Sequence, residues 1–270
     1  MSLLLVGCGK MGGAMLEGWL EQGIPASSIT IVEPNLEAAN DFVARLGVNA
    51  VPSVDASIDR NYAPDVVVFA VKPQIMDQVL PPYRKLVKHA PVFLSIAAGR
   101  TLASFEAILG ENAAIVRAMP NTPASVGRAI TVGCPNPHVS EKQADQCKSL
   151  LAGVGDVEWV KDESLLDAVT ALSGSGPAYI FLLTEAMTHA GCKAGLAPDL
   201  AARLARATVA GSGELLHQSI LPASTLRENV TSPGGTTAAA LAVLMDDHGL
   251  EELMTNAIAA ATQRSKELAG

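Results

Sequence analysis

The first 160 residues repeat one pattern, in which a short apolar run is followed by a glycine or proline turn and a longer amphipathic stretch. The apolar runs are mostly continuous rather than alternating, which is typical of parallel strands buried on both faces. The pattern therefore predicts an α/β fold around a parallel sheet. The expected strands are 3–6, 28–32, 65–71, 92–96 and 114–117, with edge strands at 130–133 and 156–160. The expected crossover helices are 11–22, 36–46 and 76–87, the last broken or restarted at Pro81-Pro82.

After about residue 161 the pattern changes, because long stretches rich in alanine and leucine at helical spacing replace the Val/Ile runs. This predicts an N-terminal domain of residues 1–160 and an all-helical C-terminal domain of residues 161–270. The expected helices are 164–172, 178–190, 198–218, 221–229, 236–247 and 251–269. Several are apolar on more than one face, which favours a helix-mediated homo-oligomer over a self-sufficient monomeric bundle.

Composition narrows the class of protein. With 270 residues, 49% of them hydrophobic and 17% charged, the chain has enough apolar material for a packed core. The net charge of −8 without a basic tract argues against a nucleic-acid partner. The N-terminus has no basic segment before its apolar run, so we expect a cytoplasmic protein, and the longest uncharged runs, 168–184 and 229–245, are too short and interrupted to span a membrane. Four scattered cysteines predict free thiols and no metal site.

The strongest local motif is a glycine turn directly after the first predicted strand. Its six residues have the G-x-G-x-x-G pattern: Gly7, Cys8, Gly9, Lys10, Met11 and Gly12. In such a turn the first glycine permits a tight bend, the second lets the backbone approach a pyrophosphate, and the third lets helix and strand pack closely. Its position at the start of an alternating series predicts a Rossmann-type domain with a dinucleotide at the helix N-terminus.

Other strand ends predict further contacts with the dinucleotide. Glu33 follows the second strand about 20 residues after Gly12, where an acid hydrogen-bonds the adenosine ribose. No arginine follows Glu33 to hold a 2'-phosphate, although Lys10 could approach one, so the choice between NADH and NADPH stays open. Small or turn-forming residues after two later strands are expected to form cofactor walls: Ala70, Val71, Lys72 and Pro73, then Ala97, Ala98 and Gly99. Asn121, between two prolines in a loop after the 114–117 strand, is also expected at the cofactor.

Two polar turns precede apolar helices in the C-terminal half. One of these helices begins with Ser173-Gly174-Ser175-Gly176-Pro177. The alternative interpretation is an ordinary helix start, with Ser175 as N-cap and Pro177 in the first turn. The second turn, residues 229–237, contains a Gly-Gly pair flanked by hydroxyl residues. Backbone N–H groups and hydroxyls at a helix start suit a carboxylate or a phosphate.

Six motifs together resemble the pyrroline-5-carboxylate reductase family. They are Gly-Cys-Gly-Lys-Met-Gly, Ala-Val-Lys-Pro-Gln, Ser-Ile-Ala-Ala-Gly, Met-Pro-Asn-Thr-Pro-Ala, Ser-Gly-Ser-Gly-Pro-Ala-Tyr and Ser-Pro-Gly-Gly-Thr-Thr, in the order seen in that family. The likeness covers essentially the whole chain. It implies NADPH- or NADH-dependent transfer of hydride to the imine carbon of 1-pyrroline-5-carboxylate, giving proline, in a homodimer formed through C-terminal helices that can assemble further.

The resemblance also implies roles for individual residues. Ser232, Gly235, Thr236 and Thr237 would bind the substrate carboxylate, and Thr237 would be the catalytic residue that hydrogen-bonds the ring nitrogen. Ser173 to Pro177 would form the opposite wall, and Asn229 would reach the nicotinamide. The family usually has a short polar residue and an arginine after the second strand, whereas this chain has Glu33-Pro34-Asn35, which argues against strict NADPH dependence.

Two other classes remain to be compared. Hydroxyacid dehydrogenases with a helical second domain share the glycine-rich start of this chain, but they need a lysine in that domain as general base. No lysine of the helical half lies in a helix interior that faces an obvious polar loop; these lysines are Lys161, Lys193 and Lys266. A redox-sensing dinucleotide module without catalysis would leave residues 232–237 without a ligand. The resemblance favours the reductase over both.

Overall fold

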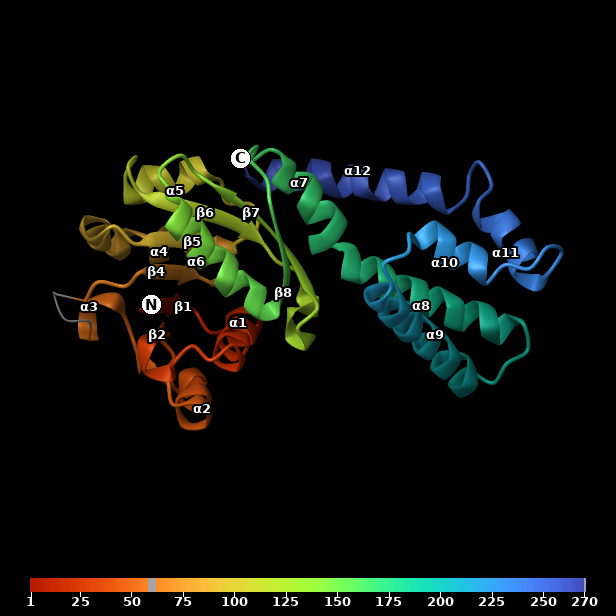
Figure 1. Ribbon diagram of the computed structural model, residues 1–270, viewed down its shortest axis with the longest axis horizontal. Coiled ribbons are helices and arrows are strands. Elements are labelled where there is room, and N and C mark those ends of the chain that lie inside the picture. Colours follow the sequence, from red (N-terminus) through yellow and green to blue (C-terminus); the bar gives the residue numbers. More distant parts are fainter. Residues whose placement is uncertain (58–61, 270) are drawn as a thin grey trace. The chain divides into compact units, whose positions relative to one another are not determined.

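The computed structural model describes residues 1–57 and 62–269. Its N-terminal part is built on an eight-stranded sheet of order β3-β2-β1-β4-β5-β6-β7-β8 (Figure 1). The neighbouring pairs are parallel except β6 and β7, which are antiparallel. The first six positions have the order of a doubly wound dinucleotide-binding sheet. The strands are β1 (Leu3–Val6), β2 (Ile29–Val32), β3 (Asn49–Val51), β4 (Val66–Phe69), β5 (Val92–Ser95), β6 (Ala114–Met119), β7 (Ala129–Pro135) and β8 (Gly155–Trp159).

Successive side chains of the central strands enter two different cores, which explains the continuous apolar runs. In β1, Leu3 and Leu5 pack on one face of the sheet, while Leu4 and Val6 pack on the other, all at most 3% exposed. The first face is covered by α1 (Lys10–Glu21) and α6 (Glu141–Leu151), and the second by α4 (Met76–Val79), α5 (Leu102–Leu109) and the 3-10 helix Pro81–His89. The predicted α/β fold is confirmed.

The break predicted at Pro81-Pro82 is confirmed: α4 ends at Val79 and a 3-10 helix begins at Pro81, since proline lacks the N–H that an α-helix interior requires. Other predicted elements need correction. The strand predicted at 130–133 is not at the edge, because β7 lies between β6 and β8. β3 was not predicted, and neither were α3 (Val54–Ser57), α5 and α6. Helix α2 (Leu36–Leu46) has the predicted bounds.

After β8 the described chain is helical, as predicted. A short helix α7 (Leu165–Val169) continues as a π-helical segment, Thr170–Gly174. The remaining helices are α8 (Gly176–Lys193), α9 (Pro198–Gln218), α10 (Ala223–Asn229), α11 (Thr236–Leu244) and α12 (Leu250–Ala269). The predicted helices 164–172 and 236–247 end differently, the first passing into the π-helical segment and the second stopping at Leu244.

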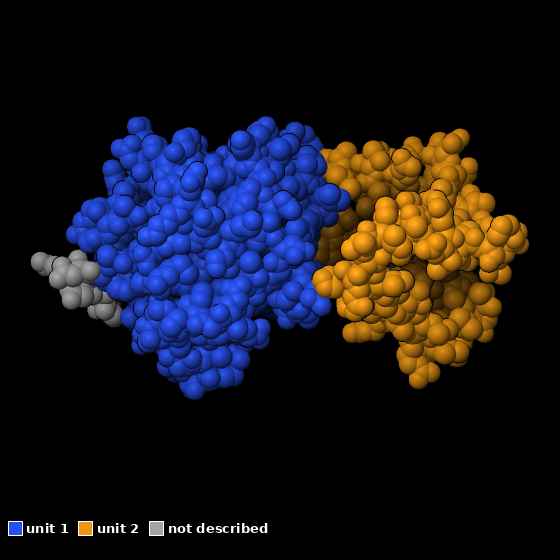
Figure 2. Space-filling view, in the orientation of Figure 1, with its two compact units in different colours: residues 1–174, 262–270 blue, residues 175–261 orange. Residues whose placement is uncertain are grey.

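The chain forms two compact units, coloured separately in Figure 2. The first contains residues 1–174 and 262–270, and the second contains residues 175–261. The change from strands to helices falls between Trp159 and Leu165, but α7 and the end of α12 belong to the first unit. Within that unit, Ser265 Oγ donates to Asp167 Oδ1 at 2.7 Å, which ties the end of α12 to α7.

One helical stretch, Leu165–Lys193, is long and apolar enough to span a membrane by length and composition. This differs from the sequence prediction, in which the uncharged runs 168–184 and 229–245 are too short and interrupted to span a membrane. Length and composition do not separate a membrane helix from a helix that packs against other protein. Within the 18-residue window that is apolar enough, 11% of the residues are buried inside the chain.

Candidate functional site

The predicted cofactor segments follow the carboxyl ends of neighbouring parallel strands. Residues 7–12 follow β1, residue 33 follows β2, residues 70–73 follow β4 and residues 97–99 follow β5. Because these strands are parallel and adjacent, their carboxyl ends lie at the same edge of the sheet. The chain proceeds from β1 to β2 on one side and places β4 on the other, so this edge contains the topological switch point where doubly wound folds bind ligands.

The three glycines of the first turn serve different purposes. Gly7 has a φ of +86°, and a Cβ there would lie 2.6 Å from Val71 Cγ1. A Cβ at Gly12 would lie 2.5 Å from the carbonyl oxygen of Gly7, so helix α1 and the turn approach too closely for a side chain. Gly9 has no atom within 4 Å of such a Cβ. The packing thus requires Gly7 and Gly12, whereas the space at Gly9 is open to a ligand.

Helix α1 begins directly after Gly9, its N-cap residue, which offers no side chain to the first N–H groups of the helix. Unpaired N–H groups and the helix dipole favour an anion at this position. The open space at Gly9 and the uncapped helix start together fit a dinucleotide pyrophosphate. Lys10, the first residue of α1, is exposed beside them.

The Glu33 carboxylate lies beside the glycine turn. Its Oε2 accepts a hydrogen bond from the backbone N–H of Cys8 at 3.4 Å, and its Oε1 accepts one from the N–H of Asn35 at 3.2 Å. The backbone N–H of Glu33 donates to Val51 O, which anchors it to β3. These bonds hold a negative charge at the end of β2, where the adenosine ribose is expected.

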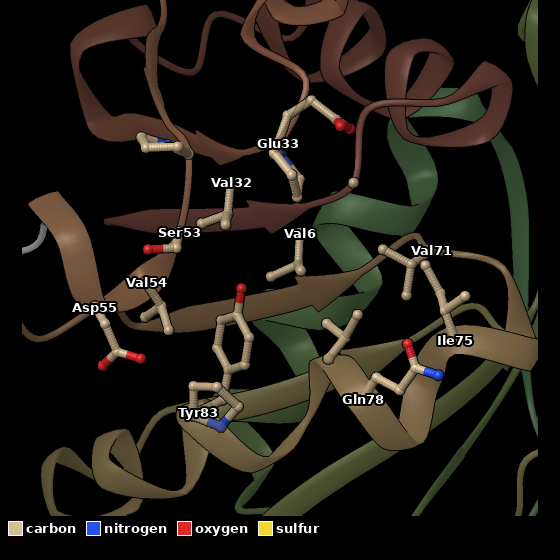
Figure 3. A pocket seen from close by; sticks show the side chains of 15 residues that line it. Val6, Val32, Glu33, Ser53, Val54, Asp55, Val71, Ile75, Gln78 and Tyr83 are labelled. Atoms are coloured by element: carbon tan, nitrogen blue, oxygen red, sulfur yellow. The ribbon is translucent and has the colours of Figure 1, made fainter.

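A cavity of about 360 Å³ adjoins this carboxylate. Figure 3 shows Tyr83 directed towards Val6 and Val32, with Glu33 at one side of the hollow and Asp55 at another. Most of its wall is apolar, and its described lining residues include two carboxylates but no lysine or arginine. The lining consists of Val6, Gly7, Val32, Glu33, Pro34, Pro52, Ser53, Val54, Asp55, Val71, Ile75, Gln78, Val79, Pro82 and Tyr83. An apolar hollow beside a ribose-binding acid suits an adenine ring.

Burial, together with the nearby carboxylates of Glu33 and Glu17, raises the pKa of the Cys8 thiol to about 12. A thiol with this pKa is protonated at neutral pH, so it is a weak nucleophile. Cys8 therefore contributes its backbone N–H and its small volume to the turn rather than thiolate chemistry.

The two predicted cofactor walls differ in exposure. Ala70 and Val71 border the glycine turn, and Lys72 is exposed at the start of the 3-10 helix that begins with Pro73. Ala97, in contrast, is 3% exposed and packs in the core of one sheet face. Gly99 has a φ of +69°, and a Cβ there would lie 3.4 Å from Leu268 O at the end of α12. Core packing thus explains the small side chain of Ala97, and the positive φ explains the glycine at position 99, which the sequence alone did not show.

Asn121, expected at the cofactor, has protein partners for both ends of its amide. Its Nδ2 donates to the carbonyl of Ser173 at 3.1 Å, and its Oδ1 accepts from the N–H of Ile130 at 3.1 Å. Ser173, expected at the substrate, donates its own hydroxyl to Val169 O at 3.0 Å. The structure therefore joins Asn121 and Ser173 to each other, a pairing that sequence analysis missed.

Gly174 is the last residue of the first unit before the second begins at Ser175, and the remaining predicted substrate residues lie in the second unit. Ser175 precedes α8, which begins with Gly176 and Pro177. Gly234 has a φ of +70°, and Gly235 is the N-cap of α11, with its N–H donating to Ser232 O at 3.0 Å. The helix starts at Thr236 with no side chain capping it, and Thr237 is half-buried. Asn229 is exposed at the end of α10. This uncapped helix start has the form expected of a carboxylate site.

Sequence analysis also missed the far wall of the cavity. Val54 and Asp55 follow β3, a strand of three residues that is too short to predict from periodicity. Gln78 lies in α4 and Tyr83 in the 3-10 helix, on the two sides of the break predicted at Pro81-Pro82. The only feature of the sequence that points to this wall is the Pro81-Pro82 pair, which predicts an interruption of the helix.

The doubly wound sheet, the glycine turn at its switch point and the acid after β2 define a nicotinamide-dinucleotide-dependent oxidoreductase. Family models divide the chain in a consistent way. Residues 2–99 match a model described as NADP oxidoreductase coenzyme F420-dependent, and residues 163–268 match one described as pyrroline-5-carboxylate reductase dimerisation.

Relatives over the whole length agree. The chain is 41% identical to a pyrroline-5-carboxylate reductase of Pseudomonas aeruginosa, covering 99% of this chain and 96% of that protein. It is 36% identical to one of Glycine max, with the same coverage. A solved Coxiella burnetii pyrroline-5-carboxylate reductase has a TM-score of 0.92 at 34% identity, covering 100% and 98% of the two chains. A Plasmodium falciparum pyrroline carboxylate reductase with NADP bound has a TM-score of 0.79 at 29% identity, with the same coverage. This chain belongs to the pyrroline-5-carboxylate reductase family.

Proposed function

We infer that the protein reduces 1-pyrroline-5-carboxylate to proline, using NADH or NADPH. Membership of the family over 99% of the chain carries this conclusion, and the glycine turn supplies a matching cofactor site. The reaction adds a hydride to the imine carbon and a proton to the ring nitrogen, so the C=N double bond becomes a single bond. The bound nicotinamide supplies the hydride.

The protein's part in this reaction is mainly to bind and orient. Residues Gly7 to Gly12 hold the pyrophosphate through the backbone N–H groups of the turn and the start of α1. Glu33 accepts hydrogen bonds from the ribose, while Val6, Val32 and Tyr83 contact the adenine. The strand-end residues Ala70, Val71, Lys72, Pro73 and Ala98 are assigned to the rest of the cofactor because they follow β4 and β5. Asn229 is assigned to it on the family resemblance.

The substrate needs a site for its carboxylate and a contact with its ring nitrogen. Ser232, Gly235 and Thr236 bind the carboxylate at the uncapped start of α11. Thr237 hydrogen-bonds the nitrogen and orients the ring. Because a threonine hydroxyl is a poor acid, orientation rather than proton donation is its main contribution.

The charges of the adenosine cavity support a preference for NADH. A 2'-phosphate would approach Glu33 and Asp55 without a lysine or arginine among the described lining residues. The side chain of Lys85, near this cavity, is already paired with Asp55. The Lys85 pair compensates the charge of Asp55, so the Glu33 carboxylate is the charge that repels a 2'-phosphate more than a ribose hydroxyl.

We also propose that two copies pair through the C-terminal helices and that such dimers assemble further. Of the described residues 175–261, only Ala201 and Ala205 are buried. Large apolar side chains such as Phe181 and Leu182 are 64% exposed, and Val243 is 74% exposed. A unit with so little core of its own needs a second surface. The match of residues 163–268 to a dimerisation model makes another copy the partner, rather than a membrane.

The deciding experiment follows loss of nicotinamide absorbance with 1-pyrroline-5-carboxylate and either NADH or NADPH. We expect turnover with both cofactors and a higher kcat/KM with NADH. Absence of turnover in folded protein that binds dinucleotide would refute the assignment. Size-exclusion chromatography with light scattering tests the assembly, which a monomeric mass would contradict.

A further inference from the structure

The side chain of Asn121 bridges two parts of the first unit. Asn121 stands just after β6 and is 9% exposed. Its Nδ2 donates to Ser173 O, which is 52 residues away in sequence, and its Oδ1 accepts from Ile130 N in β7. A carbonyl can only accept and a backbone N–H can only donate, so these partners fix the orientation of the amide.

The segment that Asn121 contacts has an unusual backbone. Thr170–Gly174 is π-helical, a conformation that is rare and often occurs at functional sites. It ends directly before Ser175, Gly176 and Pro177, the candidate substrate residues at the start of α8. Any displacement at Ser173 and Gly174 therefore moves the first residues of that candidate wall.

Met119, two residues before Asn121, contacts the same segment from its apolar side. A Cβ added to Gly174 would lie 2.5 Å from Met119 Cε, so the methionine packs directly against the glycine. Asn121, just after β6, thus holds Ser173 by a hydrogen bond, and Met119, the last residue of β6, holds Gly174 by a van der Waals contact. Both contacts act on the last two residues of the π-helical segment.

We infer that Asn121 is a positioning residue that fixes the Ser173–Gly174 end of the π-helical segment, and through it the candidate substrate wall. This rests on the proposed function for the part that concerns substrate. It replaces the expectation that Asn121 binds the cofactor through its side chain, because both ends of the amide already have partners within the protein. The loop after β6 therefore links the dinucleotide-binding sheet to the substrate segment.

The test is the near-isosteric variant Asn121→Asp. Its carboxylate still accepts from Ile130 N but has no proton to donate to Ser173 O. We expect KM for 1-pyrroline-5-carboxylate to rise by about fivefold to tenfold, as for the loss of one buried hydrogen bond, while Kd for NADH without substrate stays within about twofold. Amide hydrogen exchange of residues 170–176 should become faster, and this readout does not depend on the substrate's identity.

The matched control is Asn136→Asp. Asn136 is also a buried asparagine of the first unit, and its amide donates to Ala113 O and accepts from Ile115 N. This variant should lower stability without changing KM or the exchange of residues 170–176. If Asn121→Asp fails to fold, Met119→Ala provides the test, because it removes the apolar contact with Gly174. It should likewise raise KM for 1-pyrroline-5-carboxylate while Kd for NADH stays within about twofold.

Other outcomes separate the inference from the proposed function. A raised Kd for NADH with unchanged KM would make Asn121 a cofactor ligand and overturn the inference. Unchanged KM and unchanged exchange would also overturn it. If the wild-type protein shows no turnover but Asn121→Asp still accelerates exchange at 170–176, the positioning of the segment holds and only the proposed substrate is wrong.

Discussion

Arg117 Nη1 donates to Glu163 Oε1 at 2.8 Å, which joins strand β6 to the turn that precedes α7. The Arg117 side chain is 6% exposed, and the same Glu163 oxygen accepts from the N–H of Leu102 at the start of α5. One carboxylate thus holds together a strand and two helices. Together with Asn121, the pair fastens both ends of the α7 and π-helical region to β6.

Removing Glu163 should therefore destabilise the fold. We expect Glu163→Ala to lower the free energy of unfolding by about 2–4 kcal/mol, because it leaves a buried guanidinium without its partner. Urea denaturation measures this change. The control is Glu17→Ala, which breaks the exposed pair with Arg45 and should cost about 1 kcal/mol or less. Equal losses in the two variants would show that burial does not strengthen the Arg117–Glu163 pair.

The glycine turn allows stability to be separated from cofactor binding. Gly9→Ala places a methyl in space that the protein leaves open, so the midpoint of thermal unfolding should hardly change while Kd for NADH rises by about tenfold or more. Gly12→Ala places a methyl 2.5 Å from Gly7 O, so it should lower both stability and binding. Calorimetry and fluorescence titration measure the two effects. Normal NADH affinity in Gly9→Ala would contradict the assigned pyrophosphate site.

Glu33 should govern the choice of cofactor. In Glu33→Gln the charge is lost at constant size, so NADH binding should weaken and NADPH binding should improve. We expect the ratio of the two Kd values to shift by about tenfold, or ~1.4 kcal/mol, towards NADPH. The control Glu37→Gln removes an exposed charge from the first turn of α2. Equal effects of Glu33→Gln on both cofactors would show that Glu33 does not read the ribose.

Thr237 should affect chemistry rather than cofactor affinity. Thr237→Val keeps the shape but removes the hydroxyl assigned to the ring nitrogen, so kcat should fall by about tenfold while Kd for NADH stays constant. Thr255→Val is the control, because the hydroxyl of Thr255 bonds Glu251 O within its own helix. Unchanged kcat in Thr237→Val would remove this residue from the site.

Stability should fall in alkaline solution. Burial raises the pKa of Cys147 to about 12, whereas an unfolded thiol titrates near ~8.5. Above that lower value the unfolded state releases its proton and the folded state does not, so the stabilisation present below about pH 8.5 decreases as pH rises. At pH 10 the thiol should cost about 2 kcal/mol. Urea denaturation from pH 7 to 10 should therefore show a flatter profile in Cys147→Ala, and parallel profiles would contradict this.

Local sequence determines the elements that depend on neighbouring residues. The continuous apolar run of β1, the glycine turn and the helical spacing of α2 and α9 are each encoded within one segment, and the structure has them where the pattern predicts. A segment can be predicted in this way only if it is long enough for its hydrophobic pattern to be recognised. The three residues of β3 carry too little periodicity, and the prolines at 81 and 82 indicated a break without specifying the 3-10 helix that follows.

Tertiary structure decides what lies opposite each residue. Asn121 meets Ser173 and Arg117 meets Glu163 only because β6 lies inside the sheet, with the later strand β7 returning beside it. Likewise, the end of α12, more than 160 residues later, lies beside Gly99, whose own φ of +69° favours a glycine. Sequence alone indicates that a polar residue or a glycine has a purpose. The partner is set by long-range packing, which brings distant segments to one place and leaves each buried polar group to bond whatever lies there.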